Sequence, residues 1–441
     1  MADTSVSGTM GTAVSGGGET QRRSSYRWWI LFMIAMMALI TFMDRTNISI
    51  AAPKMMVEFG LSKIQMGFVF SAFAWAYALG QIPGGWITDK LGPRKILFIV
   101  VLFWSLMTMA TAHALGFISL VVIRFIFGLG EAASWPASTQ AMQFWYPKSE
   151  RGIVNGVTHS CGQFATSLVP LVAVALMTAW GWRSIFHIFG VVGILWSWGW
   201  WVMYRDHPEE HKRVNTAEAA YIRGGLPSTV GAKKKDIPWG LILGCPTTWI
   251  LGFAWSAYTY SLYFFWYWMP TYLLEFRHMN LKTMGFLAPL PLLGGSVGVV
   301  VGGIVTDYLL RKTGNLKWSR RGVCISAMVG SAMCIVPAAL FANPFMVIIS
   351  LVLCNFFVSL SSAPTWAVSL DIASGYAGTV SAVMNMIAQL AGSVSAIVFG
   401  ALVQKGHWIA PFFVMASVLI GSALLWAFFI DPERSVLERG K

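Results

Sequence analysis

GGWITDKLGPRK, residues 84–95, returns in the second half of the chain as GGIVTDYLLRK, residues 302–312. The aspartates of the two copies, Asp89 and Asp307, are separated by about half of the 441 residues. Each copy ends an apolar segment that is long enough to cross a membrane as a helix. A repeat of this length and direction predicts two parallel structural halves.

Apolar segments recur along the whole chain, in which 56% of residues are hydrophobic and 11% are charged. About 20 apolar residues cross the hydrocarbon layer as a helix. The segments lack the ten-residue alternation of a membrane barrel, and backbone groups in lipid must bond internally. We therefore predict an all-α membrane protein with twelve transmembrane helices in two six-helix, pseudo-symmetric halves. The predicted spans are residues 27–52, 65–88, 95–113, 117–140, 153–178, 184–204, 247–274, 283–307, 322–342, 345–367, 378–402 and 408–430.

The spans and the polar stretches around them predict five regions. The Gly- and Ser-rich beginning has almost no apolar content, and a second polar stretch separates the halves. The regions are a disordered cytoplasmic tail at 1–25, an N-terminal half at 26–204, a cytoplasmic linker at 205–246, a C-terminal half at 247–432 and a cytoplasmic tail at 433–441.

The linker contains a short helical signal. Asn215 is followed three residues later by Glu218, which resembles a capping box, and residues 217–222 can form a short helix. We expect the linker to be a solvated tether, with binding of a partner as the alternative.

The basic residues predict the orientation, because cytoplasmic loops of membrane proteins are enriched in Lys and Arg. Most of the 31 basic residues fall in segments on the side of the N-terminus. We therefore expect both termini in the cytoplasm and the protein in the plasma membrane, which is the inner membrane in a bacterium. The net charge of +13 belongs mostly to this bias. Nucleic-acid binding is not expected, since the basic residues are scattered over separate loops.

Four ionisable residues lie inside predicted spans: Asp44 and Arg45 in the first, Arg124 and Glu131 in the fourth. A charge at the bilayer centre costs at least ~2.5–3.5 kcal/mol, so it usually faces a partner or a watery cavity. Asp44 and Arg45 are about 100° apart on the helix and cannot point the same way. Arg124 and Glu131 are two turns apart on one face. We interpret these four residues as the working site.

The charges of this quartet suggest a coupling mechanism. An arginine that faces the cavity attracts an anionic substrate, and the carboxylate that it otherwise pairs with can then take up a proton. Substrate and proton thereby become thermodynamically linked. We expect H⁺ as the coupling ion, with Na⁺ as a weaker alternative because no dedicated oxygen cage is visible. The alternative structural interpretation is a pair of salt bridges that only hold helices together.

Polar side chains at helical spacing predict a shared cavity. Residues four apart share one face of a helix, and four such pairs fall on four different spans, although single amides can also join helices. The seventh span is unusually aromatic, and its rings can stack on a carbon skeleton, gate the pocket or anchor the helix. The polar pairs are Tyr77 with Gln81, His159 with Gln163, Thr365 with Ser369, and Asn385 with Gln389.

The pattern GG-x-x-TD-x-x-G-x-R-K resembles the signature loop of the major facilitator superfamily, and the resemblance extends over residues 25–432. The second copy departs from the pattern at Leu310, where the first has Gly92 and Pro93. The DR pair of the first span, FVFSAFAWAYALGQIPGG, RFIFGLGEAASWP, CGQF and TW resemble the anion:cation symporter branch. That branch includes carriers of D-galactonate, hexuronates and glucarate.

The resemblance implies roles for three sets of residues. Arg45 and Tyr77 would contact a carboxylate, while Gln163 and Asn385 would bind substrate hydroxyls. The predicted substrate-binding set is Arg45, Tyr77, Gln163, Thr365, Trp366, Ser369 and Asn385. The predicted proton-coupling set is Asp44, Glu131 and Arg124, in which Arg124 regulates Glu131. The predicted gating set is Asp89, Arg94 and Asp307, which would form a conformational latch rather than only a charged turn.

We therefore predict a secondary active transporter that imports a small organic anion by proton symport. A sugar acid, such as an aldonate, uronate or aldarate, is preferred over a dicarboxylate, a sulfonate or an aromatic acid. A drug/proton antiporter is less expected, because the fifth span lacks the glycine–proline pattern of such proteins. No HExxH, GxSxG or nucleotide-binding loop predicts an enzyme. The five cysteines lack CxxC spacing, so no metal site or cofactor is expected. We expect a monomer to be functional.

Overall fold

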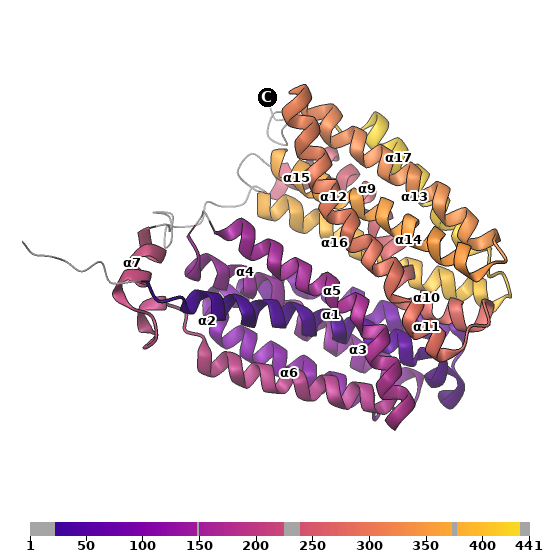
Figure 1. Cartoon of the computed structure of the whole chain (residues 1–441), viewed down its shortest axis with the longest axis horizontal. Coiled ribbons are helices and arrows are strands. Elements are labelled where there is room, and N and C mark those ends of the chain that lie inside the picture. Colours follow the sequence, from indigo (N-terminus) through magenta and orange to yellow (C-terminus); the bar gives the residue numbers. More distant parts are fainter. Residues whose placement is uncertain (1–22, 148–149, 225–238, 373–376, 433–441) are drawn as a thin grey trace, which may run out of the picture.

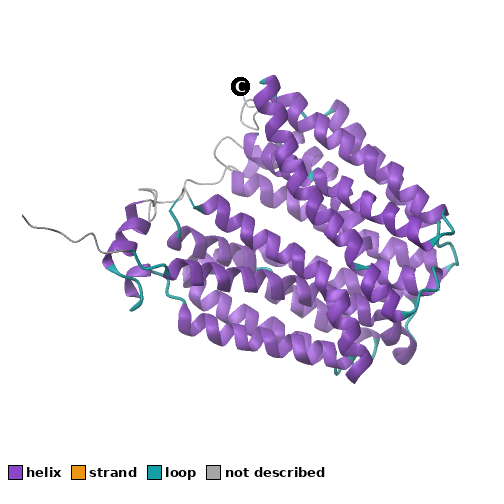
Figure 2. Cartoon of the chain, in the orientation of Figure 1, coloured by secondary structure: helices purple, strands orange, loops and turns teal. Residues whose placement is uncertain are grey.

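The computed structural model describes residues 23–147, 150–224, 239–372 and 377–432. These residues form helices and connecting loops, without a strand among them (Figure 2). Among the described residues, ten helical segments are long and apolar enough to cross a membrane. Two more run beside them: the part of α2 before Lys90, and the aromatic segment 246–276. The predicted all-α fold with twelve membrane passes is confirmed.

The N-terminal half contains six passes in six labelled helices. The second and third passes are joined in one helix, which turns sharply at Gly92 (φ 77°, ψ 157°). The fourth pass is interrupted directly after Glu131. Its helices are α1 (Tyr26–Phe59), α2 (Lys63–Thr111), α3 (Phe117–Glu131), α4 (Ser134–Trp145), α5 (Arg151–Trp180) and α6 (Arg183–Met203).

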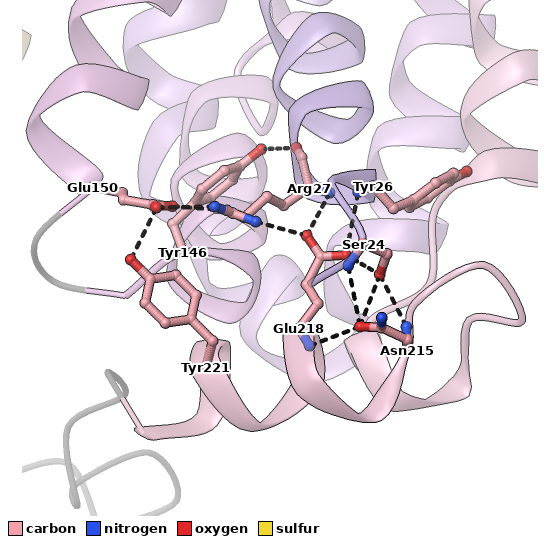
Figure 3. A network of polar contacts seen from close by, with 8 residues as sticks. All are labelled: Ser24, Tyr26, Arg27, Tyr146, Glu150, Asn215, Glu218 and Tyr221. Carbon is pink, nitrogen blue, oxygen red and sulfur yellow. Dashed lines mark hydrogen bonds and ion pairs between the residues drawn. The ribbon is translucent and has the colours of Figure 1, made fainter. Parts of the chain in front are cut away.

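The described part of the linker, residues 205–224 and 239–246, contains three short elements: η1 (Pro208–Glu210), α7 (Thr216–Gly224) and α8 (Trp239–Gly244). The Asn215 side chain accepts a hydrogen bond from the Glu218 amide at 2.9 Å, as a capping residue does. The Asn215 amide donates to Ser24 Oγ at 2.9 Å. The Glu218 side chain is fully buried and bonds to residues at the start of α1 (Figure 3). This part of the linker is therefore docked on the N-terminal half, whereas the sequence led us to expect a solvated tether.

The C-terminal half repeats the six passes with more irregular helices. Its seventh and ninth passes contain π-helical turns, which occur often at functional sites. Its elements are α9 (Pro246–Tyr263), η2 (Phe264–Trp268), α10 (Met269–Thr271), η3 (Tyr272–Phe276), α11 (Leu281–Leu287), α12 (Pro289–Thr313), η4 (Trp318–Gly322), α13 (Val323–Leu340), α14 (Pro344–Leu360), α15 (Ser362–Asp371), α16 (Ala377–Gln404) and α17 (Ala410–Phe428).

The two copies of the repeated loop turn at different places. In the first copy the chain turns at Gly92, whose dihedral angles are essentially restricted to glycine. In the second copy α12 continues through Leu310 and ends at Gly314, with φ of 63°. The departure of the second copy from the sequence pattern thus moves the turn by about one helical turn.

The described residues nearest the two chain ends lie on one face of the bundle, called here the terminal face. The two halves contact each other toward the opposite face, and their long axes converge there, on the right of Figure 1. Ser71 Oγ donates to the Ser393 carbonyl at 2.7 Å, and Trp75 Nε1 donates to Ser393 Oγ at 2.7 Å. Nearer the opposite face, Lys63 pairs with Glu275 at 2.6 Å. These three contacts join α2 to α16 and to the end of the seventh pass.

Candidate functional site

Glycines bring the second and fourth passes close together. A Cβ atom on Gly128 would lie 2.5 Å from the backbone oxygen of Phe73, and one on Gly80 would lie 2.7 Å from the Cβ of Ala132. Neither position can carry a larger residue without moving a helix. This close approach packs Glu131, at the end of α3, within the core of the N-terminal half.

Arg45 and Glu131 form an ion pair between α1 and α3. Arg45 Nε donates to Glu131 Oε1 at 2.5 Å, and Arg45 Nη2 contacts the same oxygen. The other carboxylate oxygen of Glu131 makes no hydrogen bond to the described part of the chain. The Arg45 guanidinium also lies 4.6 Å from the centre of the Tyr77 ring, a distance suited to a cation–π interaction. Arg45 and Tyr77, which the resemblance assigns to one substrate carboxylate, are therefore in contact with each other.

Asp44 points toward the third pass, away from Arg45. Its carboxylate lies near Trp104, Thr108 and Arg124, and neither oxygen has a hydrogen-bond partner within normal distance among the described residues. Arg124 Nη1 donates to the backbone oxygen of Asp44 at 3.3 Å. The adjacent positions on one helix thus direct two ionisable groups to different neighbours, as their 100° separation predicts.

The quartet is closed off from solvent in this conformation. Its members have exposed fractions of 0–3%. The sequence predicted that these residues line a cavity, but a substrate can reach them here only after side chains or halves move. Arg124 Nε and Nη2 lack hydrogen-bond partners in the described part of the chain. Unsatisfied buried donors of this kind are expensive, which makes them candidate ligand contacts.

Two tyrosines of the seventh pass lie beside the quartet. Tyr267, in the π-helical turn η2, is buried near Arg124, and its ring stacks on Phe70 of α2 with 4.8 Å between centroids. The hydroxyl of Tyr263 donates to Gln389 Oε1 at 3.0 Å. The sequence placed Tyr263 and Tyr267 in the aromatic seventh span but did not include them in the predicted site. Their spacing of four residues, which puts both rings on one face of the helix, was the signal in the sequence that could have identified them.

Two predicted hydroxyl ligands are engaged in helix packing. Thr365 Oγ1 donates to the Ser361 carbonyl at 2.7 Å, and its oxygen lies 3.7 Å from the Cys324 sulfur. Ser369 Oγ lies 2.9 Å from Ser381 Oγ and donates to the backbone oxygen of Trp366 at 2.7 Å. Both hydroxyls are therefore already satisfied within the C-terminal half.

The other predicted ligands of the substrate, Trp366, Gln163 and Asn385, are partly or largely exposed. Trp366 is 40% exposed. Gln163 is half-buried on α5, and the Tyr258 hydroxyl of α9 lies beside its side chain, so this contact joins the two halves. Asn385 is half-buried on α16, one turn before Gln389. These residues stay predictions for substrate contact.

The first loop motif packs against the end of α6. The backbone amide of Arg94 donates to Asp206 Oδ1 at 3.0 Å, and Arg94 Nη2 donates to the Trp201 carbonyl at 2.8 Å. Burial raises the pKa of Asp206, and the bond from the Arg94 amide opposes this rise. The sequence did not indicate Asp206, because nothing local marks its distant partner.

The second loop motif makes a corresponding contact in the C-terminal half, where Asp307 Oδ1 lies 3.6 Å from Arg320 Nη1. The side chain of Asp89 lies outside what the structure describes. The contacts described for Arg94 thus stay within the N-terminal half and the first residues of the linker, and the contact of Asp307 stays within the C-terminal half.

The family of the chain follows from comparison with known proteins. Residues 34–396 match the family model of the Major Facilitator Superfamily. The chain belongs to this superfamily. It is 37% identical to the probable sulfoacetate transporter SauU of Cupriavidus necator, over 94% of this chain and 96% of that protein. It is 33% identical to the probable galactarate/D-glucarate transporter GudP of Bacillus subtilis, over 94% of each.

A solved structure shows the same superfamily fold. A bacterial homologue of the human lysosomal transporter Spinster matches with a TM-score of 0.77 and 18% identity, over 91% of this chain and 96% of that one. The predicted superfamily and its anion:cation symporter branch are confirmed by the relatives. The protein is a multi-pass membrane transporter and not an enzyme.

Proposed function

We propose that this transporter imports a small organic anion together with protons. The observation that supports this proposal best is the buried Arg45–Glu131 ion pair, with Asp44 beside it lacking a described hydrogen-bond partner. An anion that binds Arg45 would replace Glu131 as its partner. In a desolvated site, a carboxylate that loses its neighbouring cation binds a proton more tightly and becomes the neutral acid. Anion and proton binding would then be linked, with Asp44 as a second proton site.

A sugar acid is the preferred substrate. Relatives named as galactarate/D-glucarate and D-galactonate transporters support this choice. The amides of Gln163, Asn385 and Gln389 offer both donors and acceptors, which sugar hydroxyls require. Arg45 would bind the carboxylate through charge-assisted hydrogen bonds.

A sulfonate is the second candidate. The hydroxyls of Thr365 and Ser369 are occupied by helix contacts, which leaves fewer partners for a substrate rich in hydroxyls. The relative named as a sulfoacetate transporter also favours it. Dicarboxylates and aromatic acids follow, since an arginine accepts any compact oxyanion, and a drug/proton antiporter fits least.

We further propose the setting in which this transport occurs. The excess of Lys and Arg near the terminal face suits the cytoplasmic side of a bacterial inner membrane. With this orientation, the contacts between halves close the outer side, and the halves would open and close alternately around the quartet. A monomer contains all the proposed site residues. H⁺ is the proposed coupling ion, with Na⁺ less favoured.

Two measurements test this function. The melting temperature of the purified protein should rise with one of a panel of sugar acids, sulfonates, dicarboxylates and aromatic acids. That compound should then accumulate unchanged in proteoliposomes when an inward proton gradient is imposed, with sodium replaced by choline. Stabilisation by sulfoacetate alone would favour the second candidate. Uptake that needs sodium, or that ignores the proton gradient, would refute proton symport.

A further inference from the structure

A mostly apolar groove of about 370 Å³ opens between α12, η4 and α13 near the terminal face. Leu309 and Thr313 line it from α12, while Trp318, Gly322 and Ser326 line it from η4 and α13. Its volume lies in the range of clefts that hold small ligands. The groove is separate from the quartet, which belongs to the N-terminal half.

The surface around the groove has the character of a lipid-facing surface. Ile304, Tyr308 and Trp318 are 64%, 58% and 70% exposed. Large exposed apolar residues on a membrane helix face the hydrocarbon, and Tyr and Trp prefer the level of the lipid headgroups. The Tyr308 and Trp318 rings therefore indicate where the headgroup layer meets this part of the protein.

Basic residues gather at the end of the groove that lies in this layer. Five lie between positions 311 and 321. Lys317 pairs with Asp431, and Arg320 pairs with Asp307, each at 3.6 Å. Those without a carboxylate at ion-pair distance in the described part of the chain are Arg311, Lys312 and Arg321.

Two of these cations are close in sequence to residues that line the groove. Lys312 is three residues after Leu309 on α12 and therefore shares its face. Its ammonium lies 5.7 Å from the centre of the Tyr308 ring. Arg321 is three residues after Trp318 and directly precedes Gly322, both of which line the groove. Arg311 lies about 200° from Leu309 around the helix, so it points to a different side.

We propose that this groove binds one anionic phospholipid of the adjacent leaflet. An acyl chain would lie along Leu309 and Ser326, and the phosphate would be held by Lys312 and Arg321. Basic pockets between membrane helices bind anionic headgroups in this way, with each cation adding to the affinity. The apolar groove distinguishes this site from a site for free phosphate, which would not need it. The proposal concerns lipid binding and does not depend on the transported anion.

Native mass spectrometry of the full chain, extracted from bilayers of equal phosphatidylglycerol and phosphatidylcholine, tests this site. The wild type should retain phosphatidylglycerol over phosphatidylcholine by on the order of tenfold, as two headgroup cations predict. Lys312→Gln with Arg321→Gln should reduce the preference to near onefold. Arg311→Gln removes one positive charge directly beside Lys312 and should keep the preference, whereas Lys312→Gln alone should lose part of it.

A second variant tests the apolar part without changing charge. Ser326→Phe should fill the groove and reduce the bound phosphatidylglycerol severalfold, and the melting temperature of each variant checks its folding. If the double charge variant does not fold, the single variants Lys312→Gln and Arg321→Gln should each lose part of the preference. Equal lipid preference in Lys312→Gln, Arg321→Gln and wild type would overturn the proposal. So would displacement of the lipid by millimolar inorganic phosphate, which would indicate a site for the free anion.

Discussion

Arg45 on α1 and Glu131 on α3 form an ion pair that joins two helices deep within the N-terminal half. Both side chains are almost completely removed from solvent. Burial of two charges costs about as much as their attraction returns, so such a pair is a weak contributor to stability. The ion pair matters for function because Arg45 can exchange its partner, so that a bound anion takes the place of Glu131.

Removing either proposed proton site should separate proton coupling from substrate binding. In Glu131→Gln and Asp44→Asn, uptake driven by a proton gradient should fall on the order of tenfold, while counterflow exchange should change much less. Both processes are measured with labelled substrate in proteoliposomes. Glu58→Gln, at an exposed pair with Arg183, is the matched control. Unchanged proton influx per substrate in both variants would contradict the assignment.

Arg45→Lys should weaken substrate binding by about tenfold, because a planar fork that can hold an oxyanion at two points becomes a single point charge. The dissociation constant is measured by titration of the purified protein with the substrate that the panel identifies. Arg183→Lys, on an exposed surface pair, should bind as the wild type does. Wild-type affinity in Arg45→Lys would exclude a two-point contact.

The first loop motif should depend on glycine at one position. Ala at position 92 would have to adopt φ of 77° and ψ of 157°, and its Cβ would lie 2.8 Å from Asp206 Oδ2. We expect Gly92→Ala to reduce the stability by about 1–3 kcal/mol. Gly85→Ala, where an added Cβ meets nothing within 4 Å, should leave the melting temperature unchanged or slightly raised. Equal melting temperatures for the two variants would refute this explanation of the turn.

The gating hypothesis for this motif has its own test. Asp89→Asn should lower the transport rate severalfold while leaving equilibrium substrate binding nearly unchanged, because a latch affects the exchange of conformations and not the site. Initial uptake rates and binding titrations of the same preparation separate the two effects. Wild-type transport by folded Asp89→Asn protein would leave the motif with only a structural role.

The docked linker helix should contribute to stability. Glu218 pairs with Arg27 at 2.9 Å and accepts from Ser24 Oγ at 2.6 Å, while Arg27 also pairs with Glu150 (Figure 3). Glu218→Gln removes a buried charge from this network and should cost about 1.5–3 kcal/mol. The loss is measured by thermal unfolding in detergent.

A surface pair on the same linker provides the control for this change. Glu209 pairs with Arg223, and both side chains are largely exposed. Glu209→Gln should therefore cost less than about 1 kcal/mol. Equal losses in Glu218→Gln and Glu209→Gln would mean that the docking of α7 does not stabilise the protein.

The membrane fold could be predicted because its signals are local. The apolar segments, the repeated loop motif and the charges Asp44, Arg45, Arg124 and Glu131 can each be read within one stretch of chain. In a bilayer, length and hydropathy nearly determine where a helix lies, since the backbone must satisfy its own hydrogen bonds. The sequence by itself therefore determined that the chain lies in a lipid bilayer. It also determined the number of membrane passes and which charged residues are buried.

The tertiary structure alone decided which of these groups meet. Arg45 contacts Glu131, Thr365 turns its hydroxyl into helix packing, and Glu218 docks on Arg27 across 191 residues of sequence. Such pairings depend on how far each helix is rotated and how closely it approaches its neighbour, as where Gly128 lies against Phe73. These quantities come from contacts between distant segments, and no local property of one helix contains them.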